Sequence, residues 1–202
     1  MYNISKGWDK MEYKEDLRIQ KTRRDLRNSI ISLLKKKPIE KITVIEICNE
    51  AMVNRITFYK YYEDKYQLLN DTFYEIKDTI VSELPSKNKF NSITEASSYW
   101  EKLTNVVLNY IDDNIDLFQA LKKNSSNDNI TKIISNITEE SFTELYLQFS
   151  KIHKIDYPIA FASAFLSGGF YSIINYWLEH TDTISKNDVL KLLNISKDKF
   201  VN

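Results

Sequence analysis

Glycine and proline are scarce in this chain of 202 residues, which holds only three of each. Proteins of the all-β and α/β classes need these residues often at their turns. Stretches in which apolar and polar residues alternate are also lacking. These absences exclude both classes and predict an all-α protein. At this length the chain can bury a sizeable core in one or two domains.

Cysteine and histidine are rare as well. The single cysteine, Cys48, excludes an intramolecular disulfide and is expected to be a small buried hydrophobe rather than a redox sensor. The two histidines, His153 and His180, lie near expected helix ends without metal-ligand spacing. The acidic pairs 112–113 and 139–140 are adjacent in sequence, so each pair points to different sides of a helix. With no Gly-rich phosphate loop either, we expect no enzyme, no cofactor and no metal site.

Long apolar runs are missing too, since no segment approaches the ~20 residues of a membrane span and no signal peptide is evident. We therefore expect a cytoplasmic protein without a membrane partner. The net charge is zero but unevenly spread: residues 1–65 hold 15 Lys and Arg against 10 Asp and Glu, and the remainder holds 13 against 18. A basic N-terminal third on an acidic remainder fits a DNA-reading head joined to a body that does not bind DNA.

One segment carries the clearest functional pattern; it begins at Thr43 and reads TVIEICNEAMVNRITFYKYYEDKYQLL. Thr43 and Glu46 have the spacing of a capping box at a helix start. The residues 52–54 end that helix, and Asn54 is a suitable N-cap for a second helix over residues 55–62. Two short helices joined by so short a turn predict a helix-turn-helix, whose second helix enters the DNA major groove.

From about Thr22 to Leu69 the chain resembles the TetR family of transcription regulators. The resemblance rests on an apolar first helix, Thr43-Val44, Ala51, Val53, and the run Thr57-Phe58-Tyr59-x-x-Tyr62-x-x-Lys65-x-x-Leu68-Leu69. Two residues depart from the family pattern, Met52 and Ile56, where glycine is usual or frequent. Methionine at a turn position that needs a positive φ would cost on the order of 1 kcal/mol.

The resemblance and the chemistry of the side chains together predict the contacts with DNA. Arg55 is the expected base reader, because its guanidinium can pair with guanine O6 and N7. Tyr59 and Lys65 match family positions that hold phosphates, whereas Phe58 and Tyr62 are expected to face inward. The full set of expected DNA-binding residues is Thr43, Arg55, Thr57, Tyr59, Lys60, Tyr61 and Lys65.

We expect an N-terminal arm over residues 1–17, a three-helix DNA-binding head over 18–64, and a C-terminal helical bundle over 65–202. Apolar periodicity predicts about nine helices in all. A linking helix is expected from about residue 64 to Pro85, and the polar stretch after it separates head from body. The other helices outside the motif are expected at 17–36, 93–112, 115–122, 128–151, 156–180 and 186–193.

A stripe of small residues marks the helix expected at 156–180. Two adjacent glycines within a helix indicate close approach by another helix or by a ligand. Packing against a second copy of the chain is favoured, with intramolecular packing and a pocket wall as alternatives. The segment from Gly168 to Leu178 also resembles the C-terminal part of one TetR subgroup. The expected dimer interface consists of Ala160, Ala164, Gly168, Ser172 and Trp177.

The resemblance further implies a homodimeric repressor that binds a palindromic operator in double-stranded DNA and is released by a small apolar or aromatic ligand. An activator, a regulator controlled by a protein partner, and a helical interaction protein that does not bind DNA stay open as alternatives. A core role is the competing interpretation at each expected pocket position. The expected pocket residues are Trp100, Tyr110, Phe118, Phe142, Tyr146, Phe165 and Tyr171.

Overall fold

The computed structural model describes residues 17–84, 91–123 and 128–201, so nearly all of the expected N-terminal arm lies outside it. Within these residues the chain forms nine α-helices and one 3₁₀ helix and has no strand, which confirms the all-α class. The elements are α1 (Leu17–Leu34), η1 (Ile39–Lys41), α2 (Val44–Glu50), α3 (Arg55–Tyr61), α4 (Lys65–Ser82), α5 (Ile93–Asp113), α6 (Ile115–Lys123), α7 (Asp128–Phe149), α8 (Ile159–Glu179) and α9 (Lys186–Val201).

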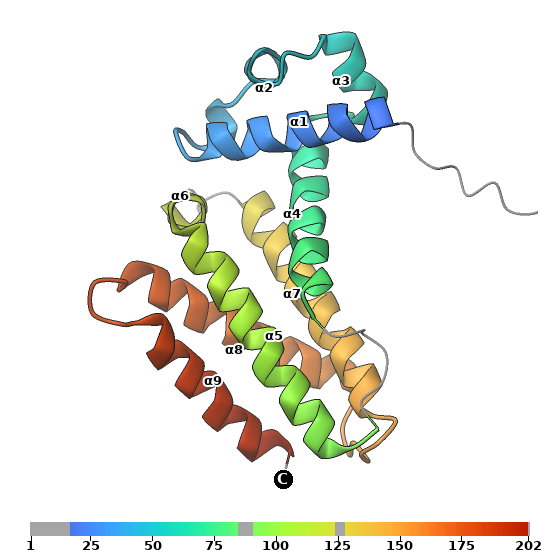
Figure 1. Ribbon diagram of the computed structural model, residues 1–202, viewed down its shortest axis with the longest axis vertical. Helices are drawn as coiled ribbons and strands as arrows, with labels where there is room; N and C mark the ends of the chain where they lie inside the picture. The colour runs from blue at the N-terminus through green and yellow to red at the C-terminus, as the bar shows by residue number, and fades with distance from the viewer. Residues whose placement is uncertain (1–16, 85–90, 124–127, 202) are drawn as a thin grey trace, which may run out of the picture.

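The helix-turn-helix has the local structure that its sequence predicts. Thr43 and Glu46 form the complete capping box at the start of α2. The Asn54 side chain accepts a 2.9 Å hydrogen bond from the Ile56 N–H and caps α3. Figure 1 shows α2 and α3 at the end of the molecule farthest from α9, with α1 lying beneath them. The head is thus positioned to present α3 outward.

Met52 occupies the turn between α2 and α3 with a φ of 52°, a left-handed conformation that agrees with the glycine usual at this position of the family pattern. The Met52 N–H bonds the Asn49 carbonyl and the Val53 N–H bonds the Cys48 carbonyl. This pair of bonds is the Schellman arrangement, which normally has glycine in the left-handed position. Cys48 itself is 3% exposed, and burial raises the pKa of its thiol, so it is an inert core residue.

Helix α4 runs from the head into the body (Figure 1). Its residues Leu68 and Leu69 are completely buried in the core of the head with Phe58. The same hydrophobic cluster continues through Leu117 of α6 and Ile130 of α7. The apolar core therefore crosses the position at which we expect the head to end, and α4 is packed along both parts of the molecule.

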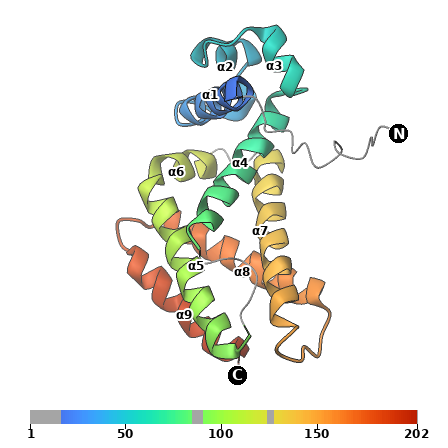
Figure 2. The same ribbon diagram turned by 45° about the vertical axis from the view of Figure 1, so that its right-hand side comes forward.

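The body consists of α5 to α9. Helix α7 packs along α8, and α5 packs along α9; both views of the fold show these neighbours (Figures 1 and 2). A second hydrophobic cluster joins α5, α8 and α9 around the buried Trp177, whose indole N–H donates a 3.1 Å hydrogen bond to the Ile184 carbonyl. Helix α9 extends to Val201, beyond the expected end at residue 193. The sequence after residue 193 is largely polar, so apolar periodicity did not predict this extension.

Helix α8 is, by length and composition alone, apolar enough to cross a membrane, contrary to our expectation that no segment is. Only 22% of its most apolar 18-residue window is buried inside the chain. Its exposed apolar residues include Phe161 at 70% and Phe165 at 62%. The hydropathy of α8 therefore reflects two apolar faces, one packed on α7 and one uncovered.

Candidate nucleic-acid interface and ligand cavity

Helix α3 separates its side chains into an inner and an outer set. Phe58 is completely buried and Tyr62, its C-cap, is 3% exposed; both face inward as expected. Arg55 and Lys60 are exposed, and Tyr59 is 51% exposed. The outer face therefore carries the cations and a phenol, the groups that contact base edges and phosphates. Thr57 and Tyr61 are half-buried beside this face.

The structure gives two of the expected DNA contacts another role. The Lys65 ammonium donates hydrogen bonds to three backbone carbonyls, those of Ile39 at 2.7 Å, Glu40 at 3.1 Å and Ile42 at 2.8 Å. An ammonium has three N–H donors, so Lys65 anchors η1 and has none left for phosphate. The Thr43 hydroxyl likewise donates to the Glu46 carboxylate at 2.9 Å. The contacts of Lys65 were not visible in the sequence, because η1 was not predicted, whereas the pairing of Thr43 with Glu46 is the capping box that the sequence predicts.

The α4 N-terminus is also closed to an anion. The Asp64 carboxylate accepts hydrogen bonds from the backbone N–H groups of Tyr66 and Gln67, both at 2.8 Å. The Gln67 side chain accepts another from the Glu63 N–H at 2.6 Å. The N–H groups of Tyr66 and Gln67 are the donors that a phosphate at the N-terminus of α4 would use. The first turn of α4 is therefore capped from within.

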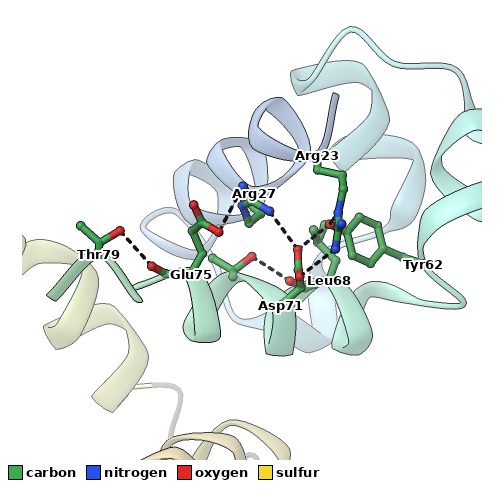
Figure 3. Close-up of polar contacts among 8 residues, drawn as sticks. Arg23, Arg27, Tyr62, Leu68, Asp71, Glu75 and Thr79 are labelled. Atoms are coloured by element: carbon green, nitrogen blue, oxygen red, sulfur yellow. Dashed lines mark hydrogen bonds and ion pairs between the residues drawn. The ribbon is translucent and has the colours of Figure 1, made fainter. Parts of the chain in front are cut away.

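A cluster of polar side chains joins α1, the end of α3 and α4 (Figure 3). Asp71 forms ion pairs with Arg23 at 3.1 Å and with Arg27 at 3.2 Å. It also accepts a 2.6 Å hydrogen bond from the Tyr62 hydroxyl. Burial and the neighbouring Asp71 raise the pKa of Tyr62 to about 12. Because Tyr62 directly follows α3, this cluster fixes the orientation of α3 relative to α4.

Ile56 and Met52 extend the outer face beyond the residues that we expected. Ile56, the second residue of α3, is 81% exposed, and Met52 is 93% exposed. Large apolar side chains at the start of a recognition helix match the methyl group of thymine, which apolar side chains contact in the major groove. The signal in the sequence was the replacement of glycine at both positions.

The body contains a cavity of about 490 Å³ between α4, α5, α6, α7 and α8. Four of the seven expected pocket residues line it, namely Trp100, Phe118, Phe142 and Tyr171. The remaining three, Tyr110, Tyr146 and Phe165, do not. Tyr110 packs against the head's core cluster, Tyr146 is 8% exposed, and Phe165 lies on the uncovered face of α8. The aromatic character of these residues did not show which of them line the cavity, which lie in the core and which lie on the surface.

The cavity wall includes one face of α4. Phe73, Ile76 and Ile80 line the cavity, and Phe73 and Ile76 also belong to the hydrophobic cluster that continues into the head. The Asp71 cluster lies one half-turn earlier on the same helix. A single helix therefore lines the cavity and also carries Asp71, which contacts Tyr62 at the end of α3.

The small-residue stripe of α8 is on the surface of the chain. Ala160, Ala164, Gly168 and Ser172 are all exposed, and a Cβ atom placed on Gly168 would meet nothing within 4 Å. Intramolecular packing therefore does not require a glycine there. Trp177 differs from the other members of the expected interface, since it is 2% exposed and lies in the core between α5, α8 and α9.

Comparisons with known proteins agree on one class. The sequence family described as the C-terminal region of a transcriptional regulator, TetR_C_8, matches residues 98–197. An uncharacterized HTH-type transcriptional regulator of Bacillus subtilis (strain 168), YxbF, is 36% identical over 53 residues, 26% of this chain. That match spans only 14% of the relative's length.

Solved structures share the fold over most of the chain. A protein from Syntrophomonas wolfei str. Goettingen described as a TetR-family transcriptional regulator has a TM-score of 0.66 at 14% identity, over 90% of this chain and 95% of that one. A TetR transcriptional regulator from Streptococcus agalactiae 2603V has a TM-score of 0.62 at 24% identity, over 89% and 95%. The dihydroxyacetone kinase operon activator DhaS has a TM-score of 0.55 at 17% identity, over 89% and 93%.

The helix-turn-helix with its exposed basic α3, joined through α4 to a helical body, defines a DNA-binding regulator of transcription and not an enzyme. The matched C-terminal family and the shared fold specify which kind. The chain belongs to the TetR family of transcriptional regulators.

Proposed function

We propose that this regulator is a homodimeric repressor that acts in the cytoplasm on a palindromic operator and is released when an apolar ligand occupies the body cavity. The observation that carries this proposal is the position of the cavity beside α4. Phe73, Ile76 and Ile80 form part of its wall, while Asp71 on the same helix holds Tyr62 at the end of α3. One helix thus contacts both the ligand site and the DNA-reading element.

The proposed DNA contacts follow from the exposed face of α3. Arg55 reads a guanine, Ile56 contacts a thymine methyl group, and Tyr59 and Lys60 hold phosphates. Thr57 and Tyr61 support them from the edge of the face. We assign Lys65 and Thr43 to the stability of the head, because their donors are already used by η1 and by Glu46.

The proposed dimer forms through α8. Its uncovered face carries Phe161, Phe165 and Tyr176, which are 57–70% exposed, around the flat surface at Gly168. Exposed apolar patches mark protein interfaces, and small residues let two helices approach closely. A two-fold axis between two such helices would present two heads to two half-sites of one operator.

Ligand control has a direct thermodynamic test. A compound that prefers the body shape incompatible with DNA shifts the population away from the DNA-bound state. A coupling free energy of about 1–3 kcal/mol gives a 5- to 150-fold loss of operator affinity. The experiment is a thermal-shift screen of apolar compounds, followed by operator titration with each stabilising compound. If stabilising compounds leave operator affinity unchanged, ligand release is wrong and control by a protein partner or constitutive binding takes its place.

Activation of transcription is the second candidate, because the activator DhaS shares this fold. Repression and activation place different demands on the promoter but not on the helix-turn-helix. A reporter gene behind the selected operator distinguishes them: deletion of the regulator raises expression if it represses and lowers expression if it activates.

A further inference from the structure

The wall of the cavity includes a tryptophan whose buried indole N–H has no hydrogen-bond partner within the chain. Among the described buried side-chain atoms, two lack a hydrogen-bond partner, Trp100 Nε1 and Asn194 Oδ1. Only Trp100 lines the cavity, and its ring packs against Phe142 at 5.7 Å between ring centroids. Leaving a buried N–H without an acceptor costs roughly 1–3 kcal/mol, and buried donors in native proteins are nearly always satisfied.

Four polar side chains of the cavity wall already donate hydrogen bonds within the chain. Thr104 donates to the Trp100 carbonyl at 2.9 Å. Thr138 and Ser141 each donate to a carbonyl of α7 at 2.7 Å. The Asn175 amide donates to the Tyr171 carbonyl at 3.0 Å. The hydroxyl protons of Thr104, Thr138 and Ser141 are therefore committed to backbone carbonyls, whereas the indole N–H of Trp100 has no acceptor.

The charged groups in the wall are already neutralised. Lys77 pairs with Glu144 at 3.4 Å, and Lys122 pairs with Glu179 at 3.0 Å. A charged ligand would have to break one of these pairs or enter an apolar cavity without a counter-ion, which is costly. The remaining wall is mainly isoleucine, leucine, valine and phenylalanine. The cavity thus favours a ligand that is uncharged.

We infer that the body cavity binds an uncharged apolar molecule that carries a carbonyl oxygen, and that Trp100 Nε1 donates a hydrogen bond to this oxygen. This inference rests on the proposed role of the cavity as the ligand site and specifies the chemistry of its ligand. A cavity of about 490 Å³ lies within the range that holds drug-sized molecules. The indole would then distinguish a ketone from a hydrocarbon of the same shape.

The test uses two probes that differ only at this oxygen, 2-acetylnaphthalene and 2-isopropenylnaphthalene. Binding of each to the full chain is measured without DNA by titration calorimetry. We expect the ketone to bind roughly 2- to 13-fold more tightly, the value of one neutral hydrogen bond. In Trp100→Phe, which keeps the aromatic wall, the two probes should bind equally.

Nuclear magnetic resonance gives a readout on the wild-type chain that does not depend on the folding of a variant. The ketone should move the Trp100 indole N–H resonance downfield, and the hydrocarbon should not. The Trp177 indole, already bonded to the Ile184 carbonyl, is the internal control and should stay in place. Failure of both probes to bind, equal binding to the wild type, a ketone preference that persists in Trp100→Phe, or an unmoved Trp100 resonance would overturn the inference. Operator binding, measured separately, is unaffected by that outcome.

Discussion

The hydroxyl of Tyr62 donates a 2.6 Å hydrogen bond to the Asp71 carboxylate, and this bond connects the end of the recognition helix to α4. Tyr62 is 3% exposed. Arg23 and Arg27 of α1 also form ion pairs with Asp71 (Figure 3). Since the body cavity lies farther along α4, the proposed ligand control requires that a movement of this helix reach α3 through Asp71.

Tyr62→Phe should lower the free energy of unfolding by about 0.5–1.5 kcal/mol, because it removes a buried hydrogen bond and leaves the ring. It should also weaken operator binding, since α3 loses one of its restraints. Urea denaturation and operator titration measure the two effects. The control is Tyr74→Phe, which removes a surface hydroxyl bonded to Glu140 at 2.8 Å. Equal losses in the two variants would show that the Tyr62–Asp71 bond has no special role.

Lys60 and Lys65 should behave differently although both lie in the motif. Lys60→Ala should leave stability unchanged, weaken binding to all DNA sequences and reduce the salt slope by about one. Lys65→Ala should lower the free energy of unfolding by about 1–3 kcal/mol, because three carbonyls lose a charged donor. Denaturation and salt-dependent titration of both variants measure this. A stable Lys65→Ala variant with a reduced salt slope would restore Lys65 as a phosphate contact.

These residues also show which parts of the molecule the sequence could predict. The Thr43 capping box, the Asn54 cap and the inward positions of Phe58 and Tyr62 depend on neighbours within a few residues, so local patterns predict them. The partners of Lys65 come from η1 and its C-cap Ile42, more than 20 residues away. Trp177 and Gly168 lie on the same helix, but contacts with distant segments bury Trp177 and leave Gly168 exposed. Spacing along one helix does not determine which neighbour covers each face.

Stability of the head should depend on pH through Glu46. A hydrogen bond from Lys37, with further bonds from Thr43, lowers the pKa of Glu46 from 4.5 to about 2. A carboxyl group whose pKa is lower in the folded state stabilises the protein above the unfolded-state pKa, and this contribution is lost as the pH falls toward the folded-state value.

Glu46→Gln should therefore be less stable than the wild type at pH 7, and the difference should shrink as the pH falls from about 4.5 toward 2. Urea midpoints measured across this range test the prediction. Glu83→Gln, at an exposed carboxyl group at the end of α4, is the matched control and should show no such trend. A wild-type advantage that stays constant down to pH 3 would contradict the assigned role of Glu46.

Gly168→Leu should convert the proposed dimer into a helical monomer that binds the operator weakly. The Cβ position at Gly168 faces open space within the chain, so the leucine fits one protomer but separates two. Ser163→Leu is the contrasting control: Ser163 is completely buried, and overpacking there should cost typically 1–3 kcal/mol of stability. Sedimentation and circular dichroism distinguish the two outcomes. A Gly168→Leu dimer with unchanged operator affinity would exclude α8 as the interface.

Selection of bound sequences from random duplex DNA, combined with the mass of the purified complex, tests the central claim most directly. Two copies of α3 on a two-fold axis should enrich a palindrome whose half-sites lie about one helical turn apart, or a multiple of it, with two protomers or a multiple of two on each duplex. Arg55→Ala, selected in parallel, should lose the preference at one base pair in each half-site. Enrichment of no sequence, or of a short asymmetric site bound by a single protomer, would contradict the account.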